Sequence, residues 1–295
     1  DGSVDVVAVI LDFDEVSMDT ESGLVRAQAG ANWDDVVARS VQLGLGGIEC
    51  LSGIPGTVGA VPVQNVGAYG AEISEVLTRV RLYNRRTDTN EWVPASDLEL
   101  AYRYSNLKFT GRAVVLEVEL QLNNDGLSRP LRFGQLTQNP GERRPVSEVR
   151  EEVLKLRRGK GMVLDPSDHD TWSAGSFFTN PVVDSALADA VQAKVRASLG
   201  DATADSMPRH PSSEADREKL SAAWLIDRAG FAKGYPGSGR ATLSTKHTLA
   251  LTNRGEATAA DIVNLARTIR DGVQETFGVE LVPEPVWLGL SMDED

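Results

Sequence analysis

Two glycine-rich runs decide the fold: Ser52-Gly53-Ile54-Pro55-Gly56-Thr57-Val58-Gly59 and Gln64-Asn65-Val66-Gly67-Ala68-Tyr69-Gly70. Five of these residues are glycine, and glycine lets backbone N–H groups come close to a ligand. Successive N–H groups in such turns form concavities that bind phosphate. Thr57 and Asn65 can add side-chain donors. The alternative is a set of tight turns in a β-rich domain, and composition alone favours that alternative.

Around these runs, apolar periodicity predicts mostly strands before residue 123 and a mixture of helices and strands after it. Strands are expected at residues 4–13, 24–30, 80–84, 91–94, 114–122, 242–251 and 279–289. Helices are expected at residues 33–45, 147–160, 186–199, 217–229 and 258–277. Asn32 is the expected N-cap of the first helix, and Thr258 with Asp261 forms a variant capping box for the last. This order predicts an α+β fold with a domain boundary near residues 123–145.

Bulk properties narrow the classes of function. A chain of 295 residues is long enough for about two domains. Its formal net charge of -13 argues against nucleic acid as a partner. No apolar run approaches the roughly 18 residues that a membrane span needs, so no membrane partner is expected. Cys50 is the only cysteine, which excludes an intrachain disulfide and favours the reducing cytoplasm.

Several generic motifs are absent. The Rossmann fingerprint, the phosphate-binding P-loop and the nucleophile elbow do not occur. His169, His210 and His247 are far apart and fit no zinc spacing, so we expect them to be surface or structural residues and expect no metal.

The order of residues in the two glycine-rich runs is similar, nearly letter for letter, to the FAD-binding segment of the UDP-N-acetylenolpyruvoylglucosamine reductase family. Further runs resemble the family in the same order: Tyr102-Arg103-Tyr104-Ser105, Lys160-Gly161-Met162-Val163-Leu164-Asp165-Pro166, Ala174-Gly175-Ser176-Phe177-Phe178-Thr179-Asn180-Pro181, Ala223-Trp224-Leu225-Ile226-Asp227 and Leu281-Val282-Pro283-Glu284. The resemblance covers essentially the whole chain, and the ordered motifs are highly specific together.

The resemblance implies a two-lobed FAD-binding unit of the vanillyl-alcohol-oxidase kind plus an α+β substrate-binding domain. We expect the FAD unit at residues 1–135, the substrate domain at 145–278, and a last strand at 279–295 that returns to the FAD unit. We also expect an N-terminal segment of the family, with a loop that contacts the FAD pyrophosphate, to be missing before Asp1. The implied FAD-binding residues are Gly53, Ile54, Pro55, Gly56, Thr57, Val58, Gly59, Asn65, Gly67, Ala68, Tyr69 and Gly70.

The resemblance also implies the reaction. NADPH reduces FAD, after which hydride reaches C3 of the enolpyruvyl group of UDP-N-acetylglucosamine enolpyruvate and a proton reaches C2. Negative charge builds up on the substrate, so preorganised donors and positive charge are needed. Arg103 corresponds to the family's catalytic arginine and suits a bidentate carboxylate contact. Ser176 corresponds to the proton donor for C2, and Glu284 to the catalytic glutamate.

Without the resemblance, each of these residues has an ordinary interpretation. Arg103 would be one arm of a surface ion pair, Ser176 a turn residue, and Glu284 a carboxylate at the end of a strand.

The implied substrate-binding residues are Lys160, Phe133, Asn180 and His210. Phe133 lacks the hydroxyl that relatives place on the substrate diphosphate, and His210 stands where some relatives carry a tyrosine. Thr179 replaces a lysine common in the family. The expected protein is a monomer. Two alternatives remain open, namely another flavoprotein oxidoreductase on the same FAD scaffold and a sugar-nucleotide-binding protein without catalysis.

Overall fold

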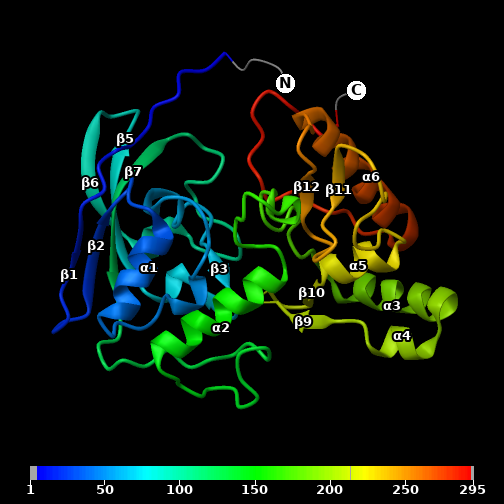
Figure 1. Ribbon diagram of the computed structural model, residues 1–295, viewed down its shortest axis with the longest axis horizontal. Helices are drawn as coiled ribbons and strands as arrows, with labels where there is room; N and C mark the ends of the chain where they lie inside the picture. The colour runs from blue at the N-terminus through cyan, green and yellow to red at the C-terminus, as the bar shows by residue number, and fades with distance from the viewer. Residues whose placement is uncertain (1–4, 213, 294–295) are drawn as a thin grey trace. The chain divides into compact units, whose positions relative to one another are not determined.

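The computed structural model describes residues 5–212 and 214–293. Contacts divide the chain into two compact units, Val7–Arg158 and a second unit that runs from Gly159 onward (Figure 1). The helix that spans this junction therefore belongs mainly to the first unit, although the sequence suggested a boundary near residues 123–145.

The first unit is built on one antiparallel five-stranded sheet in the order β1-β2-β7-β5-β6. Its strands are β1 Val16–Met18, β2 Leu24–Gln28, β5 Leu77–Asn84, β6 Thr89–Pro94 and β7 Ala113–Gln121. Two short strands, β3 Gly67–Ala68 and β4 Ala71–Glu72, pair with each other, and the two helices are α1 Trp33–Gln42 and α2 Val146–Gly159.

Helix α1 covers this sheet because one of its faces is apolar. Trp33, Val36 and Val37 are buried with Val80 of β5 and Val118 of β7 in one cluster. The predicted cap begins the helix, since the Asn32 side chain accepts a hydrogen bond from the Asp35 N–H group at 3.2 Å. Each fully buried aliphatic side chain contributes roughly 1.5–3 kcal/mol, so this face holds α1 firmly beside the sheet.

The second unit has a three-stranded sheet in the order β8-β10-β9, a separate β11-β12 hairpin and a set of helices. Its strands are β8 Val182–Asp184, β9 Arg209–Pro211, β10 Arg217–Leu220, β11 Ala241–Leu243 and β12 Leu251–Asn253. Its helices are α3 Ser185–Leu199, α4 Asp201–Asp205, α5 Ala222–Arg228 and α6 Ala259–Phe277.

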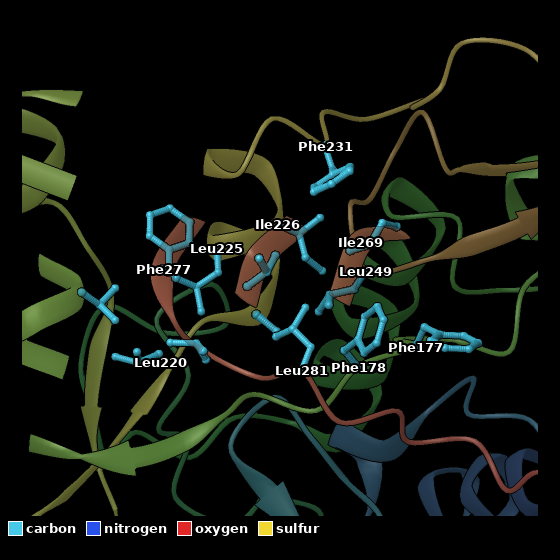
Figure 2. Packing of buried hydrophobic residues seen from close by; sticks show 14 of the residues in the cluster. Phe177, Phe178, Leu220, Leu225, Ile226, Phe231, Leu249, Ile269, Phe277 and Leu281 are labelled. Atoms are coloured by element: carbon cyan, nitrogen blue, oxygen red, sulfur yellow. The ribbon is translucent and has the colours of Figure 1, made fainter. Parts of the chain in front are cut away.

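One apolar core joins these elements (Figure 2). Leu225 and Ile226 of α5 pack with Ile269 and Phe277 of α6 in this core. Phe178, from the Gly-Ser-Phe-Phe run, is 1% exposed in the same cluster. Burying the second phenylalanine therefore fixes the position of the serine two residues before it.

The α+β class is confirmed, as are most of the elements with local signals. The hairpin across residues 87–90 forms as β5-β6, and the capping box of Thr258 and Asp261 is present at α6. The helices expected at 147–160 and 186–199 begin and end within a residue of prediction, as α2 and α3.

Four expectations were wrong in whole or in part. Of the strand predicted at residues 4–13, the structure describes residues 5–13, and these do not form a strand. Val4 lies outside the described residues. Val7 is 91% exposed there, and a β-rich sequence forms a strand only beside a partner strand. The helix predicted at 217–229 begins only at Ala222, because Arg217–Leu220 pairs with both β8 and β9 as β10.

The other two wrong expectations are the strands predicted at residues 242–251 and 279–289. The single strand predicted at 242–251 is the β11-β12 hairpin, whose connecting loop covers residues 244–250. Residues 279–289 make one isolated bridge, between Phe178 and Pro283, because the prolines at 283 and 285 remove ladder donors. The described contacts of this segment lie within the second unit, and its return to the FAD unit stays a prediction.

Candidate functional site

The first glycine-rich run is anchored on the N-terminus of α1. The Trp33 indole N–H donates to the Leu51 carbonyl at 3.3 Å, and the Trp33 backbone N–H donates to the Gly56 carbonyl at 3.0 Å. Between these contacts, the Gly53 N–H donates to Asp34 Oδ1 at 2.6 Å. One helix turn thus sets the path of the loop.

The two halves of this run serve different purposes. Gly56 has φ +114° and is exposed, and no atom lies within 4 Å of the position that a Cβ would take. Its backbone requires glycine and leaves open space for a ligand. By contrast, the N–H groups of Val58 and Gly59 donate to the carbonyls of Ala31 and Ala29, both at 2.9 Å. The expectation that the whole run offers N–H groups to a ligand therefore suits only its first half.

Asn65 in the second run serves the protein itself. It is 1% exposed and has a left-handed φ of 46°. Its amide nitrogen donates to Glu72 Oε2 at 2.9 Å and to the Ala101 carbonyl at 3.0 Å. Its amide oxygen accepts from the Ser74 N–H at 3.1 Å. Sequence reasoning treated this side chain as a donor to a ligand, whereas its contacts hold the loop in shape.

The structure places Arg103 directly beside the second run. Arg103 Nη2 donates to the Gly67 carbonyl at 2.7 Å, and the guanidinium carbon lies 5.1 Å from the centre of the Tyr102 ring. Arg103 has φ 53°, a conformation that costs a non-glycine residue energy and that clusters at functional sites. The Lys108 ammonium donates to the Arg103 carbonyl at 3.0 Å. Hydrogen bonds therefore hold both the side chain and the backbone carbonyl of Arg103.

Tyr69 and Phe133 come together next to this run. Their rings meet edge to face, with centroids 5.3 Å apart. Burial raises the pKa of the Tyr69 phenol, so the hydroxyl stays protonated. Phe133, expected to contact the substrate, thus contacts a residue expected to bind the cofactor.

These features fit a flavin nucleotide. Residues 53–57 provide an exposed turn with an open glycine and the Thr57 hydroxyl, which suit phosphate oxygens. Tyr69 and Phe133 offer aromatic edges, and Arg103 offers a planar cation bonded to Gly67 of the same run as Tyr69. FAD would therefore be held by the glycine turns and would supply hydride transfer.

In the second unit, Ser176 and Glu284 lie on paired segments. The Glu284 N–H donates to the Phe177 carbonyl at 2.8 Å, and the Thr179 N–H donates to the Val282 carbonyl at 3.0 Å. The antiparallel bridge between Phe178 and Pro283 lies between these two bonds. The structure thus brings together two of the three residues expected to be catalytic.

Among the residues that the structure describes, the Ser176 hydroxyl has no hydrogen-bond partner. A turn serine usually bonds nearby backbone, as the neighbouring Ser173 does by accepting from the Gly175 N–H at 3.3 Å. Ser176 therefore lacks the contact that its ordinary interpretation requires.

The other expected substrate residues are spread over the second unit. The Asn180 amide oxygen accepts from the Ala222 N–H at 3.0 Å and so caps the start of α5. His210 lies exposed on β9, opposite Lys219 of β10. Lys160 follows α2 and belongs to a group of cations described next.

The charges of two lysines, Lys160 and Lys233, act on His247, which the sequence predicted to be a surface or structural residue. These three residues are called the cationic cluster below. Burial, together with the charges of Lys160 and Lys233, lowers the pKa of His247 to about 4. The imidazole is therefore neutral near pH 7 and can both donate and accept a hydrogen bond. Of these three residues, only Lys160 was predicted to bind the substrate. Lys233 and His247 lie in loops that no sequence periodicity marks.

An ionic network holds the hairpin loop that carries His247. Asp170, which is 5% exposed, accepts from the Thr245 N–H at 3.0 Å, from the Thr245 hydroxyl, and from Arg254 Nη1 at 2.8 Å. The Lys246 ammonium pairs with Asp168. Residues 244–247 are therefore fixed on both sides of the turn.

Over residues 5–212 and 214–293, no three His, Cys, Asp or Glu side chains gather in a way that could hold a metal ion. None of the described helices has the length and apolarity that crossing a bilayer requires.

An FAD-type glycine turn in a unit that matches an FAD binding domain over residues 1–89 makes this chain an FAD-dependent flavoprotein. Residues 165–288 match the UDP-N-acetylenolpyruvoylglucosamine reductase C-terminal domain. The chain belongs to the UDP-N-acetylenolpyruvoylglucosamine reductase family.

Individual relatives agree with this assignment. The chain is 65% identical to UDP-N-acetylenolpyruvoylglucosamine reductase 2 of Corynebacterium glutamicum, over all of this chain and 80% of that protein. It is 61% identical to the reductase of Corynebacterium diphtheriae, over 99% of this chain and 76% of that protein. The crystal structure of the reductase from Thermus caldophilus matches with a TM-score of 0.56 at 25% identity, covering 91% of this chain and 73% of that one.

Proposed function

We propose that this chain reduces UDP-N-acetylglucosamine enolpyruvate to UDP-N-acetylmuramate, with FAD as its cofactor and NADPH as the electron donor. The reaction supplies a precursor of peptidoglycan. Family membership and the names of relatives at 61–65% identity support this function. The structural observation that carries it is the pairing of Glu284 with Phe177, which sets Ser176 beside the glutamate segment.

Protonation of the substrate is the task of the second unit. Ser176 donates its proton to C2 of the enolpyruvyl group as hydride arrives at C3. A serine hydroxyl is a weak acid, but the charge-rich species formed by hydride addition is a strong base, so donor and acceptor are matched. Glu284, on the paired segment, is the third residue that we place at the developing charge.

Charge stabilisation is the task of Arg103. Its planar guanidinium suits the substrate carboxylate, on which negative charge grows during the reaction. The hydrogen bond to Gly67 holds the group in place before the substrate arrives, so little reorganisation is needed.

The cationic cluster binds the substrate diphosphate. Lys160 and Lys233 supply positive charge, and the neutral His247 supplies an N–H donor. We assign Asn180 and His210 to the sugar and nucleotide parts of the substrate. The cluster takes over the contact that Phe133 cannot make, since Phe133 lacks a hydroxyl.

We place the protein in the cytoplasm as a monomer. Its single cysteine, Cys50, is buried and unpaired, which suits a reducing compartment. Light scattering of the purified holoenzyme tests the monomer, and cell fractionation tests the compartment.

The central experiment follows NADPH oxidation by the purified FAD-loaded protein under anaerobic conditions. With UDP-N-acetylglucosamine enolpyruvate present, NADPH should be consumed, and mass spectrometry should find a product heavier by two hydrogens. Rapid NADPH oxidation with oxygen but none with the enolpyruvyl substrate would instead identify an oxidase. Binding of the substrate without turnover would identify a sugar-nucleotide-binding protein.

A further inference from the structure

We infer that Asp34, held by Arg150, is a positioning residue that sets the turn of residues 53–57 for FAD. The inference rests on the proposed function, because it assumes that this turn receives the cofactor. It concerns residues outside both glycine-rich runs and outside the catalytic group.

The geometry around Gly53 carries the inference. The Gly53 N–H donates to Asp34 Oδ1 at 2.6 Å, and Arg150 donates to both oxygens of Asp34, at 2.7 and 2.9 Å. On its other side, the Gly53 carbonyl accepts from Arg157 Nη2 at 3.0 Å. Charged groups from α1 and α2 therefore hold both polar groups of one glycine. Such charge-assisted bonds are shorter and stronger than neutral ones and restrict the orientation of the peptide.

Gly53 is the residue at which this restraint matters. It has φ +71°, and its added Cβ would lie 2.9 Å from Leu154 Cδ2 of α2. The glycine begins the turn that leads to the open Gly56. A change in the orientation of the Gly53 peptide therefore alters every backbone group presented by residues 54–57.

The charge of Asp34 explains the need for Arg150. Burial alone would raise the pKa of Asp34, but the hydrogen bonds from Arg150 and Gly53 outweigh burial and lower it. Asp34 is therefore an anion at neutral pH, beside a turn that receives phosphate groups. Arg150, a bidentate partner, neutralises that anion. Without Arg150, the carboxylate would repel the cofactor and would also lack its own partner.

Three variants separate the charge of Asp34 from its hydrogen bond to Gly53. Asp34→Asn removes the charge and the bidentate pair but keeps an oxygen for the Gly53 N–H. Arg150→Met leaves the carboxylate uncompensated. Asp34→Asn combined with Arg150→Met removes both charges. FAD affinity should therefore be lowest for Arg150→Met alone, and the double variant should recover part of the loss.

The test measures the FAD dissociation constant of each purified chain by flavin fluorescence, and the melting temperature of each apoprotein. Asp34→Asn should bind FAD roughly tenfold more weakly, the scale of one charge-assisted hydrogen bond. Arg150→Lys should fall between the wild type and Arg150→Met, because it keeps the charge and loses the fork. Asp35→Asn is the matched control, since Asp35 is exposed in the same first turn of α1 and should leave FAD affinity unchanged.

Two results would overturn the inference. If the Asp34 and Arg150 variants melt earlier but bind FAD like the wild type, the pair only stabilises the fold. If Arg150→Met and the double variant bind FAD equally, compensation of charge plays no part. Wild-type protein that binds FAD but does not reduce UDP-N-acetylglucosamine enolpyruvate would refute the proposed function and leave this inference standing, which separates the two failures.

Discussion

The guanidinium of Arg103 donates a 2.7 Å hydrogen bond to the carbonyl of Gly67. A Cβ on Gly67 would lie 2.8 Å from Glu72 Cγ, 2.9 Å from the Ala71 carbonyl oxygen and 3.1 Å from Arg103 Nη1, so glycine leaves room for all three neighbours. Two motifs that are 36 residues apart are joined by this contact. The proposed catalytic arginine is thereby positioned by the cofactor run and not by its own loop alone.

Arg103→Lys tests this relationship. A lysine cannot make a planar, bidentate contact, so reduction of the enolpyruvyl substrate should slow by on the order of a hundredfold, as for other lost electrostatic stabilisers. Stopped-flow absorbance of the flavin measures that step. Arg112→Lys is the control, because Arg112 bonds Asn106 in the same loop and should keep the wild-type rate. A near wild-type rate for Arg103→Lys would remove Arg103 from the mechanism.

Ser176→Ala should separate the two half-reactions. NADPH reduces FAD without protonating a substrate carbon, so this half should keep its rate. Reoxidation of the reduced flavin by the substrate should fall by at least about a hundredfold, the usual effect of a lost proton donor. Stopped-flow absorbance gives both rates. Ser173→Ala, which loses only the bond from Gly175, should change neither.

One outcome would argue against Ser176 as the proton donor, and a second would trace the effect of the substitution to the FAD site. Normal reoxidation in Ser176→Ala would make the residue an ordinary turn serine. Equal loss of both half-reactions would show that the substitution disturbs the FAD site.

His247→Gln should change how stability depends on pH. The folded protein holds His247 at a pKa of about 4, below the ordinary 6.5. Between these pH values the unfolded chain binds a proton that the folded chain does not, so stability falls as pH drops through this window. Glutamine removes that contribution, and the melting temperature should fall less steeply between pH 6.5 and 4.

Exposed His210 provides the control for this measurement, and His210→Gln should keep the wild-type profile. Identical profiles for the wild type and His247→Gln would mean that His247 is not held neutral among the two lysines.

Asp170→Asn should weaken substrate binding through the loop that it holds. The amide cannot pair with Arg254, so residues 244–247 lose a charged anchor and His247 loses its fixed position. The KM for the enolpyruvyl substrate should rise about tenfold, the scale of a lost charged hydrogen bond, with little change in kcat. Steady-state kinetics measure both.

Asp189→Asn is the matched control, because Asp189 pairs with Arg209 and not with the hairpin. FAD affinity should be unchanged in both variants. A KM that stays at the wild-type value would show that the network does not position the substrate site.

Local signals in the sequence determined much of this protein. The Asn32 cap, the Thr258-Asp261 box and the residue 87–90 turn each act within a few residues, so they predicted α1, α6 and the β5-β6 hairpin. The order of residues within the sequence motifs identified the family by resemblance, and with it the fold class and the cofactor.

Tertiary structure decided what depends on distant partners. Arg217–Leu220 has a helical pattern but pairs between two strands, whereas residues 5–13 have a β-rich pattern but form no strand. Asn65 was expected at a ligand and instead bonds Glu72 and Ala101. In each case, contacts with residues that are distant in the sequence outweigh the local preference of the residues themselves.

The same reason separates the site residues that were predicted from those that were missed. Ser176 and Glu284 stand in recognisable runs, whereas Lys233 and His247 lie in loops and join Lys160 only after folding. Asp34 and Arg150 are 116 residues apart, and neither belongs to a motif. An ion pair needs its two charges a few ångströms apart, and that proximity is created by the packing of helices and loops, which no local pattern records.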